Sequence, residues 1–170
     1  GFVGWEGNAK DHAGVAICYS INGSMDFLSY NDPPSGIYFS QVCDVVSFMN
    51  RECNGNVRLI ALISMRNFRA QKKEIKNRLP DAIVVPMFPK VKWWRMNLLW
   101  LFLLCTFTKT KKIMARGPFA CNLALTAKNW GLTRKVIFDS RGAYYAELTE
   151  YKVVDDAKIV SQIEAIEKRA

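Results

Sequence analysis

Charged or hydroxyl side chains follow three of the short apolar runs in the chain, where they could bind an anion or a sugar. The three segments are Ser35-Gly36, Arg116-Gly117-Pro118 and Asp139-Ser140-Arg141-Gly142. In an open parallel sheet, ligands bind beyond the carboxyl ends of the strands, near the point where the strand order reverses. Three such segments at one edge would therefore form a polar cleft.

Each segment predicts a particular contact and also has a plain structural alternative. Ser35-Gly36 leads into a predicted helix, whose free amides and dipole favour an anion, and Gly36 allows a ligand to approach the backbone closely. Arg116 supplies a fixed cation. Asp139 and Arg141 are two residues apart and can project to one side of the edge. The alternatives are a tight turn at Gly36, a solvated arginine at 116 and a structural ion pair between Asp139 and Arg141.

Short apolar runs that alternate with helical periods predict the sheet that would position these segments. Residues 57–63 are typical of a strand covered on both faces, and Tyr38, Val42, Val45 and Met49 recur at the spacing of a helix. Strands are expected at 26–30, 57–63, 82–85, 112–115 and 135–138, and further helices at 66–78, 91–108, 119–130 and 155–169. This alternation predicts an α/β fold, a doubly wound, Rossmann-like parallel sheet of order 3-2-1-4-5 with helices on both faces.

Length and composition define the class of protein. The 170 residues are enough for one domain with a sizeable core. A chain that is 50% hydrophobic and 23% charged is neither disordered nor fibrous. The formal net charge of +9 favours a partner that carries phosphate groups or presents an anionic surface.

Few residues are of the types that bind metals or form catalytic triads. Five cysteines without a C-x-x-C pair argue against a disulfide framework and against a zinc site. They predict a reducing, cytoplasmic compartment, with a location at the inner face of the membrane as one possibility. His12 is the only histidine, which argues against a histidine metal site or a Ser-His-Asp triad. No metal is expected.

The first 24 residues differ from the rest because they are rich in glycine and lack a period. They are interpreted either as a tag that ends in Gly23-Ser24 before a natural start at Met25, or as an N-terminal hairpin that turns at Asn22-Gly23. The α/β domain is expected to span residues 25–170.

The polar segments, taken in order, resemble a known family. Asp139-x-Arg141-Gly142-x-x-x-x-Glu147 resembles the "DxRGxxxxE" signature of the N-terminal domain of family-4-type glycosyltransferases of GT-B fold. Residues 113–117 are similar to the "iHaRg" segment of that family, with Met114 in place of the histidine. Residues 28–36, followed by Ser40-Gln41-Val42, resemble its first strand and loop, with the single Gly36 in place of a Gly-Gly pair. The terminal helix resembles the one that precedes the crossing to the second domain.

This resemblance implies an enzyme that moves a sugar from a nucleotide-sugar donor to a glycan or lipid-linked acceptor, with retention. The donor is a substrate, so no cofactor is expected. In such enzymes the N-terminal domain shapes the acceptor side, and a C-terminal domain, which is the expected partner here, grips the nucleotide. The 170 residues alone are therefore expected to be inactive.

The resemblance also implies roles for individual residues. Ser35 and Gly36 would lie near the donor phosphate, and Arg116 would be a cleft cation or an acceptor contact. Asp139 and Arg141 are the expected catalytic pair, with Asp139 as an orienting carboxylate. Two further residues are expected to bind substrate, namely Gly142 and Glu147. Such a reaction depends on positioning and charge stabilisation more than on a side-chain base.

A lysine-flanked apolar segment follows the third strand. Its uncharged run, 96–108, has 13 residues and is shorter than the ~20 needed to cross a bilayer. Residues 98–104 are interpreted as core, although docking on anionic lipid is the alternative. The residues expected to contact a membrane in that case are Lys90, Lys92, Trp93 and Trp94.

Two other function classes remain as alternatives. The net charge and the basic helix expected at 66–78 are compatible with a nucleic-acid-binding protein, but the basic residues do not alternate with aromatic ones. A non-catalytic flavodoxin-like or receiver-like module is the other alternative. A receiver would need an acidic pair after the first strand, where Asn31-Asp32 offers one acid.

Overall fold

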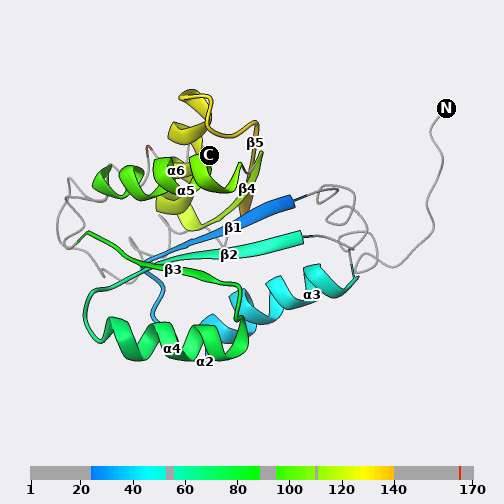
Figure 1. Ribbon diagram of the computed structural model, residues 1–170, viewed down its shortest axis with the longest axis vertical. Coiled ribbons are helices and arrows are strands. Elements are labelled where there is room, and N and C mark those ends of the chain that lie inside the picture. Colours follow the sequence, from blue (N-terminus) through cyan, green and yellow to red (C-terminus); the bar gives the residue numbers. More distant parts are fainter. Residues whose placement is uncertain (1–23, 53–55, 89–94, 110, 140–164, 166–170) are drawn as a thin grey trace.

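Five parallel strands form one sheet in the computed structural model (Figure 1), which describes residues 24–52, 56–88, 95–109, 111–139 and 165. The order in space is β3-β2-β1-β4-β5, and every pair of neighbours is parallel. The predicted doubly wound sheet and its strand order are therefore confirmed. The strands are β1 (Ser24–Tyr30), β2 (Asn56–Ile63), β3 (Ile83–Pro86), β4 (Lys112–Arg116) and β5 (Lys135–Asp139).

Helices cover both faces of this sheet, as the apolar side chains of the strands require. On one face lie α3 (Asp44–Glu52) and α4 (Phe68–Arg78), and on the other lie α5 (Leu98–Thr108) and α6 (Gly117–Asn129) (Figure 1). Successive residues of a strand point to opposite faces. Phe27 of β1 thus packs with Val46 and Ile75 on the α3–α4 face, whereas Leu28 packs with Leu101 on the α5–α6 face.

The helical segment after β1 changes its winding before it reaches α3. It begins as α2 (Gly36–Tyr38), continues as a π-helical turn, η1 (Phe39–Cys43), and returns to α-helix at Asp44. A π-turn contains an extra residue, which rotates everything that follows relative to an α-helical period. Tyr38, Val42 and Met49 are buried as predicted, but Val46 is the buried residue of the next turn and Val45 is only partly buried.

The ends of some elements differ from the prediction. The helix expected at 91–108 begins at Leu98, after a short 3₁₀ turn at 95–97, and residues 89–94 lie outside the described part of the chain. Residues 1–23 and the helix expected at 155–169, apart from helical Ala165, also lie outside it. The basic helix expected at 66–78 is present as α4, with Ile75 as its buried residue.

Candidate functional site

Arg116 and Asp139 end adjacent strands and form an ion pair at the carboxyl edge of the sheet. They are direct partners in the register of β4 and β5, so their side chains point to the same face. Arg116 Nη1 lies 2.8 Å from Asp139 Oδ2. Arg116 is only 8% exposed, whereas the Asp139 side chain is 30% exposed. The carboxylate is thus the more accessible member of the pair.

The same guanidinium reaches the helical segment that follows β1. Arg116 Nη1 donates to the main-chain oxygen of Gln41 over 3.2 Å, and Nη2 donates to Gln41 Oε1. Within the described residues, the buried Nε atom has no hydrogen-bond partner. Arg116 therefore links the end of β5 to the segment that begins at Gly36. The solvated loop arginine that was the alternative for this position is excluded.

The turn after β1 is closed by a serine cap. Ser35 has an extended backbone, and its Oγ accepts a hydrogen bond from the Tyr38 amide over 3.2 Å. This is the usual geometry of an N-cap. A Cβ added to Gly36 would meet no heavy atom within 4 Å, and the backbone there is not left-handed. Neither packing nor backbone conformation therefore requires glycine at this position.

A glycine does meet a conformational need in the turn after β4. Gly117, the first residue of α6, has φ of +77°, a value that side chains with a Cβ disfavour. Pro118 follows in the first turn of α6, where its missing amide hydrogen costs no hydrogen bond. Arg116 can therefore end a strand while α6 begins at the next residue.

Sequence reasoning missed a buried hydroxyl pair beneath this turn. The Ser29 Oγ and Tyr38 hydroxyl atoms lie 3.3 Å apart, and both residues are buried. Burial raises the pKa of the Tyr38 hydroxyl above its ordinary value, while the hydrogen bond between Ser29 and Tyr38 lowers it by a smaller amount. The tyrosine is thus a neutral hydrogen-bonding group near neutral pH. Spacing along the chain gives no sign of this pair, because it joins β1 to a helix.

A second polar group that was not predicted lies at the same edge on the other face of the sheet. The side chain of Asn97 is fully buried. Its Oδ1 accepts a hydrogen bond from the Phe88 amide over 2.9 Å, and its Nδ2 lies 3.5 Å from the Tyr30 hydroxyl. The Tyr30 ring in turn packs against Phe119. Asn97 therefore connects the ends of β1 and β3.

The structure brings together only part of the predicted site. Ser35, Gly36, Arg116 and Asp139 follow or end β1, β4 and β5, which are neighbours in the sheet. The other predicted site and membrane-contact residues lie outside the described part of the chain, so their positions stay predictions. They are Arg141, Gly142, Glu147, Lys90, Lys92, Trp93 and Trp94.

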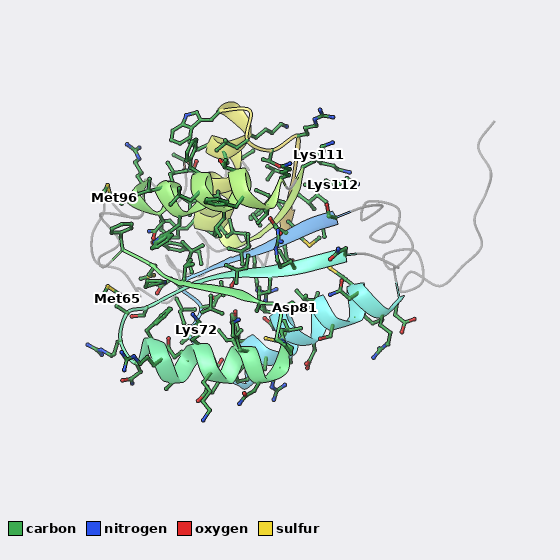
Figure 2. All side chains as sticks on the ribbon, in the orientation of Figure 1. Met65, Lys72, Asp81, Met96, Lys111 and Lys112 are labelled. Carbon is green, nitrogen blue, oxygen red and sulfur yellow. The ribbon has the colours of Figure 1, made fainter. Side chains whose placement is uncertain are left out.

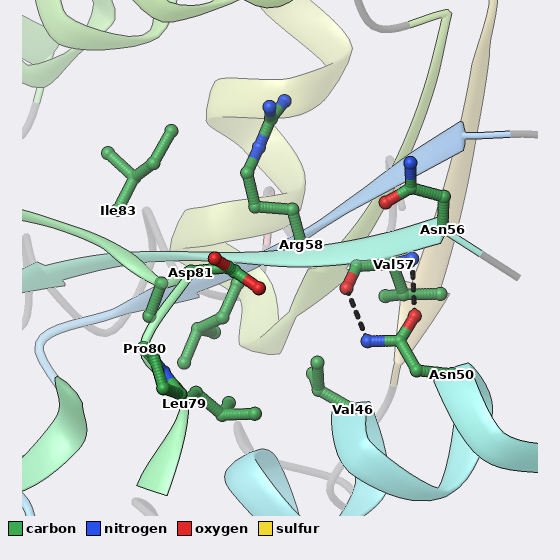
Figure 3. Close-up of a pocket in the computed structure, with 11 residues that line it drawn as sticks. Val46, Asn50, Asn56, Val57, Arg58, Leu79, Pro80, Asp81 and Ile83 are labelled. Carbon is green, nitrogen blue, oxygen red and sulfur yellow. Dashed lines mark hydrogen bonds between the residues drawn. The ribbon is translucent and has the colours of Figure 1, made fainter. Parts of the chain in front are cut away.

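A cavity of about 690 Å³ lies at the opposite edge, at the amino ends of β2 and β3 (Figure 3). The Asn50 side chain on its wall exchanges two hydrogen bonds with the main chain of Val57, at 2.7 and 2.8 Å. Arg58, which also lines it, is paired with buried Asp26, and the closest approach is 2.6 Å. None of Ser35, Gly36, Arg116 and Asp139 lines it, so this cavity is not the site that the sequence predicts.

Two findings concern metals and membranes. Among the described residues, no group of three or more His, Cys, Asp or Glu side chains is placed to hold a metal ion. None of the helices in the described ranges has both the length and the apolar character needed to cross a bilayer.

Comparison with known proteins gives no family for this chain. No protein-family model, no curated protein and no solved structure matches it. The class defined by the fold is therefore a Rossmann-like α/β domain with a polar carboxyl edge.

Proposed function

We propose that this chain is the acceptor-side domain of a glycosyltransferase that uses a nucleotide-sugar donor and modifies a glycan or a lipid-linked acceptor. One observation carries the proposal. Arg116 contacts both Asp139 and Gln41, and these three residues come from the three segments that resemble the glycosyltransferase domain. Segments that are 75 and 23 residues apart in sequence thus meet at one edge, the edge where sheets of this topology bind ligands.

Gly36 gives independent support. Neither φ nor packing requires glycine at this position. A ligand that approaches the backbone closely would explain the residue. The amides at the start of the helical segment 36–52 could then meet a phosphate or a sugar hydroxyl.

The ion pair suggests how the site would work. Arg116 is held by Gln41, so it fixes the carboxylate of Asp139 through Oδ2 and leaves the residue partly exposed. In the proposed site, Asp139 accepts a hydrogen bond from a sugar hydroxyl and orients the acceptor. Arg116 acts as a positioning residue whose charge is balanced by Asp139. Rate enhancement would then come from orientation and from stabilised charge.

The cysteines support a reducing compartment for this activity. Cys43, Cys105 and Cys121 are unpaired and buried, so they behave as small apolar side chains. A cytoplasmic location, where nucleotide-sugar donors are made, is part of the proposal.

Calorimetric titration tests the proposal. The probes are UDP-glucose, GDP-mannose and a set of neutral oligosaccharides, each added to the wild-type chain and to Asp139→Asn and Asp81→Asn. Binding of a sugar or nucleotide-sugar that weakens at least tenfold in Asp139→Asn, with Asp81→Asn unchanged, supports the proposal. Asp81 is the matched control because it lines the cavity at the opposite edge.

The same titration separates the alternative classes. A nucleic-acid-binding protein would bind duplex DNA or RNA with an affinity that falls steeply with salt, and would ignore the sugars. No observation favours that class over sugar transfer. On α4, Arg78 lies over the Phe39 ring and is paired with Asp44, and Lys72 lies over Phe68, so part of its charge faces the chain itself.

A further inference from the structure

The outer side of α5 carries large apolar side chains that no described part of the chain covers. Leu101 and Cys105 face the sheet and are buried. The opposite side, which we name the α5 outer face, is formed by Leu99, Phe102, Leu103 and Phe107, and all four residues are exposed. Phe107 is 81% exposed and Leu99 is 54% exposed. Exposed Met96 extends the face into the preceding turn.

This arrangement explains why the sequence of α5 is apolar on all sides. A helix of that kind is usually covered all round, either by protein or by lipid. Here the sheet covers one side only. With 11 residues, α5 is about 16 Å long, which is roughly half the thickness of a bilayer core. The helix can therefore lie along a membrane interface but cannot cross it.

The hydroxyl of Thr106, on the same side of α5, has a hydrogen-bond partner within the helix. Thr106 is exposed, and its hydroxyl donates to the main-chain oxygen of Phe102 over 2.8 Å. In an apolar environment, a hydroxyl without a hydrogen-bond partner would be costly. Because this hydroxyl is satisfied within the helix, the outer face can leave water without losing a hydrogen bond.

Cationic side chains lie next to this apolar face. Residues 82–138 contain ten Lys or Arg and no Asp or Glu. Exposed Lys109 and Lys111 follow the end of α5, and Arg134, also exposed, donates its amide to the Lys111 oxygen. In Figure 2, Met96 lies near one end of α5, and Lys111 and Lys112 lie beyond the other. Positive charge therefore borders the apolar side chains at the C-terminal end of α5.

We propose that the α5 outer face docks the protein on an anionic lipid membrane. Phe107, Phe102 and Leu103 would enter the boundary between headgroups and acyl chains, while Lys109 and Lys111 would bind the anionic headgroups. Charge favours lipid over a second copy of this chain, because a symmetric dimer through this face would bring like charges together. The proposal does not depend on sugar transfer, although it would place the edge of the sheet near a lipid-linked acceptor.

Vesicle co-sedimentation of the full chain tests this proposal. Vesicles of phosphatidylcholine are compared with vesicles that also contain phosphatidylglycerol, at a fixed salt concentration. We expect binding to the anionic vesicles and at least tenfold weaker binding to the neutral ones. We also expect Phe107→Ser and, separately, the double variant Lys109→Glu/Lys111→Glu to reduce binding to anionic vesicles at least tenfold.

Matched controls come from the other face of the sheet. Phe48→Ser removes an exposed phenylalanine of α3, and Lys73→Glu/Lys76→Glu reverses two exposed charges of α4, and each should change binding less than twofold. Equal unfolding midpoints exclude misfolding as the cause, because Phe107 is mostly exposed. Absence of binding, equal binding to both kinds of vesicle, or equal losses in the controls would overturn the proposal. A dimer that Phe107→Ser dissociates, without vesicle binding, would overturn it as well.

Discussion

Arg116 and Asp139 are opposite each other on adjacent parallel strands, and the ion pair between them, 2.8 Å long, holds the last residue of β5 against the last residue of β4. Gln41 binds the same guanidinium from the helical segment after β1. This pair is therefore both a structural tie and the centre of the proposed site, and the two roles make different predictions.

The structural role predicts the effect of Asp139→Ala. This substitution leaves the mostly buried Arg116 cation without the Asp139 carboxylate. Breaking a buried ion pair by removing one partner lowers the free energy of unfolding by about 3–5 kcal/mol. Because the Asp139 side chain is 30% exposed, we expect a smaller loss of about 2 kcal/mol in urea unfolding. The control is Glu52→Ala, which breaks the exposed Arg51–Glu52 pair and should cost less than about 0.5 kcal/mol. Equal effects of the two variants would contradict the structural role.

The two turn glycines are expected to respond differently to alanine. Gly117→Ala forces a Cβ into a left-handed backbone and should lower the free energy of unfolding by about 1 kcal/mol. Gly36→Ala meets open space and should not lower stability, because alanine is the better helix former. Thermal or urea unfolding of both variants measures this. A large loss of stability in Gly36→Ala would show that the residue is structural and would weaken the proposed ligand contact.

At the opposite edge of the sheet, Asp26 is expected to be essential for stability but not for ligand binding. Asp26 is 1% exposed and accepts hydrogen bonds from Arg58 at 2.6 and 3.0 Å. Asp26→Ala should cost about 3 kcal/mol, because it removes the buried carboxylate that accepts both of these hydrogen bonds. In the fraction that stays folded, binding of any ligand at the carboxyl edge should be unchanged. If Asp26→Ala keeps the stability of the wild-type chain but loses ligand binding at the carboxyl edge, this prediction is wrong.

The buried thiols predict how stability changes at alkaline pH. Burial raises the pKa of each of Cys43, Cys105 and Cys121 to about 11. Well below pH 9, the ordinary pKa of a thiol, these groups are protonated in the folded and the unfolded chain alike. Between pH 9 and 11 only the unfolded chain ionises readily, so stability falls as the pH rises. Urea midpoints at pH 8 and pH 10 should show this fall, and it should be smaller in Cys121→Ala. If the urea midpoint of Cys121→Ala falls between pH 8 and pH 10 as much as that of the wild-type chain, Cys121 does not contribute to the loss of stability.

Much of the sheet could be predicted from the sequence because buried parallel strands appear as short apolar runs between helical periods. The phase of the first helix could not, since the π-turn at Phe39–Cys43 is not encoded in apolar spacing and moves burial from Val45 to Val46. The interpretation of residues 98–104 as core is wrong for Leu99, Phe102 and Leu103, which are exposed, and right for Leu101. A helix that is apolar on every side gives no sign of which side the sheet covers.

For the candidate site, the sequence predicts which edge of the sheet carries it but not the contacts between its residues. Strand order placed Arg116 and Asp139 on adjacent strands, but their contact depends on the register of β4 and β5, which single-sequence patterns do not determine. Gln41, Tyr38 and Asn97 were missed because their partners are distant in sequence. Arg141 was the expected partner of Asp139 in the structural alternative, whereas the partner within the described residues is Arg116.

The most direct test of the central claim is an amide-resolved NMR titration of the chain with UDP-glucose, GDP-mannose and neutral oligosaccharides. We expect at least one of these probes to shift the amide signals of Gly36, Gly117 and Asp139 together, with no change at Asn50 or Asp81. In Gly36→Val, which should keep the fold, we expect the shifts of the residues next to position 36 to disappear. If no sugar or nucleotide-sugar moves these amides, or if the shifts cluster around the cavity at the other edge, the proposed sugar-transfer site is wrong.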